Sequence, residues 1–195
     1  MGLFDVLNTP YVILVVLLLF SFLPPILFLI WTRNTERYGR EQWHVVLKVF
    51  IWGAVFAILI AVFISTILMF LYSRFVPVYV VLGGDPTVQT LVLALIIAPF
   101  VEEGAKALGV YTAWYAVSEV EDGIVYGAAS GFGFSATENL VYGVAALIAG
   151  GPALSITVIV IRSISSTFLH ASATSVSGYG IGKHMVLGGR QRVLP

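Results

Sequence analysis

The segment "VEEGAKALG" at 101–109 holds the residues of this chain with the clearest capacity for chemistry. Glu102 and Glu103 are adjacent there, and Lys106 follows at a spacing that lets it reach either carboxylate along a helix. Ionisable side chains inside an apolar segment are expensive to bury, so they usually have a functional role. One lysine neutralises only one of the two carboxylates. The second carboxylate is left over, which favours a chemical role over a purely structural ion pair.

Two later apolar segments carry further polar residues, Glu138 with Asn139 and Arg162 with His170. At 1.5 Å per helical residue, Glu102, Glu138 and His170 lie about 21, 22 and 18 Å from the ends of their segments that face one side of the membrane. These depths agree within one helical turn, whereas unrelated ion pairs would have no reason to share a level. The spacing therefore predicts one polar site built from three helices.

A carboxylate and a histidine in such a site can activate water, either directly or through a bound metal. Glutamate oxygens and one imidazole are also suitable zinc ligands. The chain has no cysteine and neither an HExxH nor a GxSxG motif, which excludes thiolate catalysis and argues against a serine hydrolase. Three classes remain from the residues alone: an intramembrane hydrolase, an ion- or proton-coupled transporter or ion-binding bundle, and a non-catalytic membrane scaffold. Transporters commonly carry internal repeats and none is visible here, which lowers the second class.

The elements that must position this site are membrane helices. The chain has 195 residues, of which 59% are hydrophobic and only 10% are charged, whereas soluble domains carry about 25% charged residues. This apolar composition makes the lipid bilayer an expected partner. The net charge is zero and no basic patch is present, so nucleic acid is not an expected partner. We expect a single integral membrane domain over residues 1–195.

Five apolar segments are long enough to cross a bilayer, since about 20 helical residues span its hydrocarbon core. They cover residues 11–31, 45–72, 86–115, 123–147 and 154–182. The expected fold class is therefore all-α, a multi-pass transmembrane helical bundle of about five spans, with the site in spans three to five. The prolines at 24 and 25 predict a kink in the first span, and Pro99 predicts a kink or a restart in the third. A restarted helix would place Glu102 and Glu103 near its positive end.

Other local signals mark where the helices begin and connect. In "GGDPT" at 83–87, Asp85 predicts an N-cap and Pro86 the first helical residue, while "AGGP" at 149–152 predicts a tight turn between spans four and five. The segment "VPVYVVLGG" at 76–84 is interpreted as a loop. Arginines at 33, 37 and 40 follow the first span, and Lys183 with arginines at 190 and 192 follows the fifth. The positive-inside rule then places the N-terminus outside and the C-terminus inside.

Residues at four-residue spacing predict how spans four and five pack. Span four has a stripe of small residues, which allows another helix to approach closely, and span five has a stripe of polar residues. The two stripes consist of Gly123, Gly127, Gly131, Ser135, Asn139 and Gly143, and of Arg162, Ser166, His170 and Thr174.

Three of these segments, taken in order, resemble the PrsW family of intramembrane proteases, which is related to the CAAX prenyl proteases and to bacteriocin-processing enzymes. They are "VEEGAK" at 101–106, "EDGIVYGAASGFGFSATENLVYG" at 121–143 and "RSISSTFLHASATSVSGYGIG" at 162–182. The resemblance implies a helical endopeptidase of the prokaryotic plasma membrane. Its expected partner is a membrane protein or peptide substrate.

The resemblance also implies roles for individual residues. Glu102 or Glu103 would activate the attacking water, with Lys106 tuning their charge, and His170 would act as a second catalytic group or as a metal ligand. Glu138 occupies the position at which the prenyl-protease relatives carry a histidine, so the ligand set of those relatives does not carry over unchanged.

The remaining polar residues would complete the site. Asn139 would donate a hydrogen bond to a developing oxyanion, and Arg162 would act as a counter-ion. One divalent metal such as zinc, held by Glu103, Glu138 and His170, is one arrangement consistent with these residues. A metal-free mechanism that uses the glutamates alone is the other.

Overall fold

The computed structural model describes residues 9–36, 39–75 and 85–191, which form helices and short connections and contain no strand. The expectation of an all-helical chain is confirmed, and the segment at 76–84 lies outside the described residues. The elements are α2 Pro10–Thr35, α3 Trp43–Ile51, η1 Trp52–Ala57, α4 Ile58–Arg74, α6 Pro86–Val92, η2 Leu93–Ile97, α7 Ala98–Tyr111, η3 Trp114–Ala116 and α8 Val120–Gln191.

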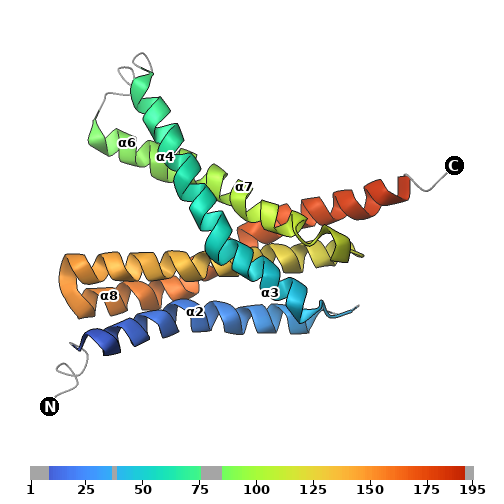
Figure 1. Cartoon of the computed structure of the whole chain (residues 1–195), viewed down its shortest axis with the longest axis horizontal. Helices are drawn as coiled ribbons and strands as arrows, with labels where there is room; N and C mark the ends of the chain where they lie inside the picture. The colour runs from blue at the N-terminus through green and yellow to red at the C-terminus, as the bar shows by residue number, and fades with distance from the viewer. Residues whose placement is uncertain (1–8, 37–38, 76–84, 192–195) are drawn as a thin grey trace.

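Among the residues that the structure describes, three helices are long and apolar enough to cross a membrane, namely Tyr11–Thr35, Trp43–Arg74 and Val120–Gly188. The last of these, α8, consists of two helical arms joined at Gly150 and Gly151, whose backbone angles are non-helical. Gly151 has a φ of 76°, a conformation that glycine adopts without a steric penalty. The arms therefore fold back on each other in the α8 hairpin (Figure 1), and the tight turn expected at "AGGP" is confirmed.

The two arms of α8 pack backbone against backbone along the predicted stripe of small residues. A Cβ atom added at Gly127 would collide with the carbonyl oxygen of Thr174, and one added at Gly131 would lie 2.5 Å from the carbonyl oxygen of His170. The close approach therefore extends to the level of His170. Helix α2 lies along the same hairpin (Figure 1) and continues through Pro24 and Pro25 as a helix.

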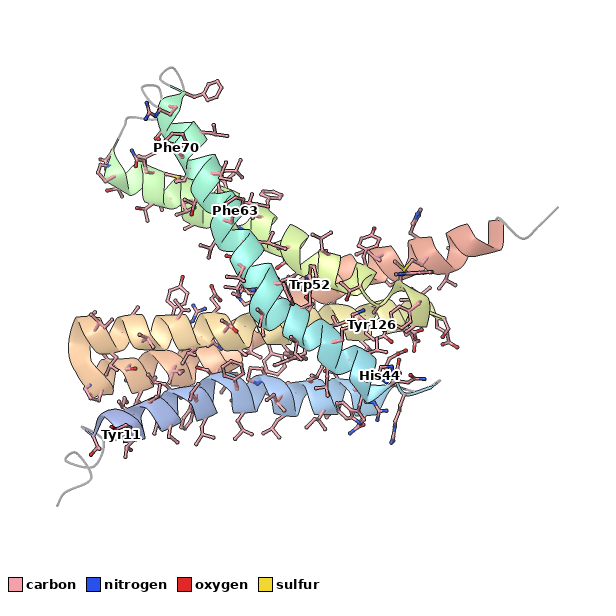
Figure 2. All side chains as sticks on the ribbon, viewed as in Figure 1. Tyr11, His44, Trp52, Phe63, Phe70 and Tyr126 are labelled. Atoms are coloured by element: carbon pink, nitrogen blue, oxygen red, sulfur yellow. The ribbon has the colours of Figure 1, made fainter. Side chains whose placement is uncertain are left out.

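Helix α3, the π-helical segment η1 and α4 follow one another without a break and cross the α8 hairpin. The crossing is tight because a Cβ atom at Gly53 would collide with the backbone of Ser130. Trp52, labelled at the crossing in Figure 2, donates a hydrogen bond from Nε1 to the carbonyl oxygen of Ala105 at 3.0 Å. Beyond this point α4 leaves the hairpin and exposes side chains such as Phe63 (Figure 2). Helix α7 is thereby fixed to the crossing, while α4 leans away from α8.

The third apolar segment is also helical, and it begins as the sequence predicts. Asp85 caps α6 by accepting a hydrogen bond from the backbone N–H of Thr87 at 2.7 Å, and Pro86 occupies the first turn. The restart expected at Pro99 is absent, because Ile97 and Ala98 have helical angles and the π-helical segment η2 leads directly into α7. A π-helical turn holds an extra residue and is one known cause of a change in helix direction. Glu102 and Glu103 therefore lie inside a continuous helix and not at a new N-terminus.

Candidate active site

Lys106 of α7 lies at the centre of the polar site and is fully buried. Its Nζ atom lies 2.5 Å from Oε1 of Glu103, 3.9 Å from Oε2 of Glu102 and 2.8 Å from Nδ1 of His170. The same ammonium lies 4.4 Å from the centre of the Phe134 ring, within the range of a cation–π interaction. One lysine thus connects α7 to both arms of the α8 hairpin.

His170 bridges Lys106 and Glu138, since its Nε2 atom lies 2.8 Å from Oε2 of Glu138. A lysine paired with a carboxylate is an ammonium and can only donate hydrogen bonds. His170 must then accept at Nδ1 and carry its hydrogen on Nε2, which donates to Glu138. The ring is therefore a neutral imidazole in a tautomer that its two neighbours impose.

Glu138 on the first arm and Arg162 on the second form an ion pair across the hairpin. Arg162 Nη2 lies 2.6 Å from the same Oε2 atom that His170 contacts. The guanidinium is held from two further sides, by the Tyr142 ring at 3.8 Å and by Asn139, whose Oδ1 accepts from Arg162 Nε at 3.2 Å. The Ser166 hydroxyl also reaches this atom at 3.5 Å, so three donors from the second arm converge on one oxygen of Glu138.

Asn139 faces the interior of the hairpin and is completely buried. Its amide nitrogen lies within 3.4 Å of Ser135 Oγ, Thr167 Oγ1 and the carbonyl oxygen of Arg162. Every polar atom of the side chain thus has a partner inside the hairpin. This placement holds Arg162 in position and directs the amide away from the cavity described below.

The adjacent glutamates of α7 have different surroundings. Glu103 uses both oxygens, one with Lys106 and the other as acceptor of the Thr174 hydroxyl at 3.1 Å. Glu102 has only the longer 3.9 Å contact with Lys106 among the contacts described, and it lines a cavity. Of the two carboxylates, Glu102 is the one whose oxygens are available to another molecule.

Glu102, Glu138 and His170 each offer a ligand atom, and these atoms all lie within 4.8 Å of one another. Catalytic zinc sites use three protein ligands, and both imidazole nitrogen and carboxylate oxygen are zinc donors, although such sites usually hold more histidines than this group does. The residues therefore fit a zinc ion in number and donor type, provided that His170 exchanges its hydrogen bond to Glu138 for the metal. The sequence suggested Glu103 for this set, but the structure places Glu102 there and Glu103 against Lys106.

A cavity of about 440 Å³ adjoins the site, between α4 on one side and η2, α7 and the first arm of α8 on the other. Glu102 and Glu138 form its polar wall, and the rest of its lining is mainly apolar. The α4 wall, which includes Ser65 and Thr66, was not predicted from the sequence. A signal was present, because these are the only two hydroxyl residues between positions 49 and 71.

A second group of acids, also missed from the sequence, lies where the connection after α2 meets the start of α8. Glu36, Glu41 and Asp122 offer oxygens within 4.8 Å of one another, and the Tyr126 hydroxyl donates to Glu41. Burial raises the pKa of Glu41 to about 7, and the nearby carboxylates act in the same direction. The hydrogen bond from Tyr126 acts in the opposite direction but does not cancel these effects. Figure 2 shows Tyr126 at this end of the molecule, close to His44 and the start of α3.

The fold and site define a class, a helical membrane protein whose buried carboxylates and histidine face an apolar cavity. A family model described as PrsW family intramembrane metalloprotease matches residues 41–194. The chain belongs to the PrsW family, as the resemblance in the sequence implied. The "Protease PrsW" of Clostridioides difficile (strain 630) is 27% identical over 179 residues, covering 90% of this chain and 69% of the relative. No solved structure matches.

Family membership supports a membrane protease that acts on a protein substrate. This outcome favours the hydrolase among the three classes that the residues left open.

Proposed function

We propose that this chain is a five-span intramembrane endopeptidase that hydrolyses a peptide bond of a membrane-associated protein. The observation that carries the proposal is the meeting of Glu102, Glu138 and His170, which come from three separate helical segments, within 4.8 Å and beside an apolar cavity. Such a site brings water-activating groups to a place that a membrane-embedded peptide can reach.

We further propose that the N-terminus lies outside and the C-terminus inside a prokaryotic plasma membrane. In Figure 1 the connection after α2, the start of α8 and the end of α8 lie at one end of the molecule. Basic and aromatic side chains meet at that end, with the Arg33 guanidinium 4.7 Å from the Trp43 ring and Lys48 Nζ 5.1 Å from the Tyr115 ring. Aromatic residues are enriched at both membrane interfaces, and an excess of lysine and arginine is typical of the cytoplasmic one.

Glu102 is the proposed general base. It would take a proton from a water in the cavity, and the resulting hydroxide would attack the carbonyl carbon of the substrate. When the carbon–nitrogen bond breaks, the protonated Glu102 would return that proton to the leaving amine. The assignment favours Glu102 over Glu103 because both oxygens of Glu103 already have partners, whereas Glu102 faces the cavity.

The other residues of the site would orient the reacting groups. Lys106 would hold His170 in one tautomer and pair with Glu103 of the same helix, while Arg162, itself held by Asn139, would fix Glu138. A divalent metal such as zinc, held by Glu102, Glu138 and His170, would supply Lewis-acid polarisation of the water and the carbonyl. In the metal-free alternative, His170 Nε2–H, which lies 2.8 Å from Glu138, would donate to the developing oxyanion.

Cleavage of a model single-span peptide by the purified chain in liposomes tests the proposal. We expect Glu102→Gln to lower the cleavage rate by about 10²- to 10⁴-fold, the usual contribution of a general base. Glu103→Gln should have a smaller effect, and Glu119→Gln, which changes an exposed acid outside the site, should have none. Equal rates for Glu102→Gln and the unchanged chain would rule out Glu102 as the base.

A further inference from the structure

One face of α4 forms the wall of the cavity opposite the site glutamates. Ala61, Ser65 and Met69 recur every four residues on this face, and Val62 lies beside them. The face is apolar apart from hydroxyl groups. The Thr66 hydroxyl donates to the carbonyl oxygen of Val62, whereas Ser65 has no hydrogen-bond partner among the residues that the structure describes. An unpartnered hydroxyl in an apolar wall is available to a peptide group that enters the cavity.

The volume of the cavity suits a short stretch of peptide and exceeds what one side chain needs. Ligand pockets typically enclose about 300–1,000 Å³, and this cavity measures about 440 Å³. Its position also gives access from the lipid, because α4 and the α6–α7 helix diverge from the α8 hairpin (Figure 1). A charged peptide would lose its hydration there without gaining a partner along most of the wall. The occupant that fits is therefore an apolar segment that arrives from within the membrane.

We propose that this cavity binds the apolar membrane segment of the substrate next to the scissile bond, and that the α4 face selects the side chains that it admits. The inference rests on the proposed protease function, because it names the subsite of the same reaction. In this arrangement Ser65 contacts the substrate backbone, while Met69 and Val62 limit the size of the neighbouring side chain. Glu102 and Glu138, on the opposite wall, face the peptide bond.

Changes in the size of the α4 face test the proposal through substrate preference. Single-span peptides with Ala, Leu or Phe beside the mapped cleavage position are reconstituted with each variant, and kcat/KM is compared. We expect Ser65→Phe to disfavour Phe and Leu relative to Ala by at least about tenfold, the effect of one or two methylene groups in an apolar pocket. Met69→Ala should shift the preference toward Phe. Ile64→Phe, which places the same phenyl ring at a neighbouring α4 position outside the cavity lining, should leave the preference unchanged.

A second measurement keeps the cavity testable without turnover. A photo-reactive benzoylphenylalanine is placed at Val62 or, as control, at Ile64, and crosslinking to the same single-span peptides is measured in liposomes. Crosslinking at Val62 alone supports the cavity even if no peptide is cleaved, in which case only the protease proposal fails. Normal cleavage with an unchanged preference in Ser65→Phe and Met69→Ala would overturn the subsite while leaving the protease intact. Crosslinks from Val62 to lipid only would overturn it as well.

Discussion

The substitution Gly131→Ala tests whether the close approach of the α8 arms sets the geometry of the site. The added Cβ would lie 2.5 Å from the carbonyl oxygen of His170, whereas ordinary contacts of a Cβ begin at 3.4 Å. The arms must therefore separate by about 0.9 Å at this level, since the obstacle is backbone and cannot rotate away. The residue whose backbone moves is His170 itself.

The consequence for the site follows from the two hydrogen bonds of His170. Both measure 2.8 Å, one to Lys106 and the other to Glu138. A displacement of about 0.9 Å along either bond takes it beyond hydrogen-bond range. Misplacement of a catalytic group by about 1 Å can lower a rate by about 10²-fold. We expect a loss of that order in cleavage rate, together with a destabilisation of about 1–3 kcal/mol from overpacking.

The assay compares single-turnover cleavage of a single-span peptide in liposomes with the thermal unfolding of the same preparations. Gly180→Ala is the matched control, because a Cβ at Gly180 would meet nothing within 4 Å and the residue lies in the same helix. That variant should cleave normally and gain a few tenths of a kcal/mol from lower chain entropy. If Gly131→Ala cleaved within about threefold of Gly180→Ala, the claim that a displacement of about 1 Å at His170 disables the site would be refuted.

Three further predictions concern charge and metal. Lys106→Met leaves Glu103 without its cation, so we expect a destabilisation of about 1–3 kcal/mol. The double variant Lys106→Met/Glu103→Gln, measured in a double-mutant cycle, should recover part of this loss. The folded pKa of Glu41, about 7, exceeds its unfolded value of 4.5, so the free energy of unfolding should fall as the pH rises from 4.5 to 7. The fall should reach at most about 3 kcal/mol, and pH-dependent urea unfolding of Glu41→Gln should lack it. Elemental analysis should find about one equivalent of zinc per chain and clearly less in His170→Ala, whereas equal metal contents would contradict the proposed ligand.

The meeting of three helices at one depth could be predicted because the rise of a helix per residue is constant. The depth of Glu102, Glu138 or His170 follows from its distance in residues to the end of an apolar segment. A small error in the position of that end shifts the predicted depth by less than one helical turn. The contact between the α8 arms was predictable for a similar reason, since small residues at Gly127 and Gly131 admit another backbone.

The different surroundings of Glu102 and Glu103 could not be predicted in this way. Adjacent residues on a helix point about 100° apart, so their roles depend on how α7 is rotated. The π-helical segment η2 precedes Pro99 and carries an extra residue in its turn, which changes the rotation of everything after it. Nothing in the apolar sequence of that segment specifies such a turn. The cluster of Glu36, Glu41 and Asp122 could not be predicted for another reason, since only tertiary packing brings these residues together.

The charges of the site suggest why such a cluster exists within an apolar bundle. Three carboxylates, Glu102, Glu103 and Glu138, face two cations, Lys106 and Arg162, and the tautomer assigned to His170 is neutral. One negative charge is therefore in excess, and the partner distances place it on Glu102, whose nearest cation is 3.9 Å away. A buried excess charge is unfavourable unless a proton or a cation neutralises it. A carboxylate that takes a proton from water, or that holds a metal which polarises water, would relieve this imbalance, so the excess charge at Glu102 would favour the first step of the proposed hydrolysis.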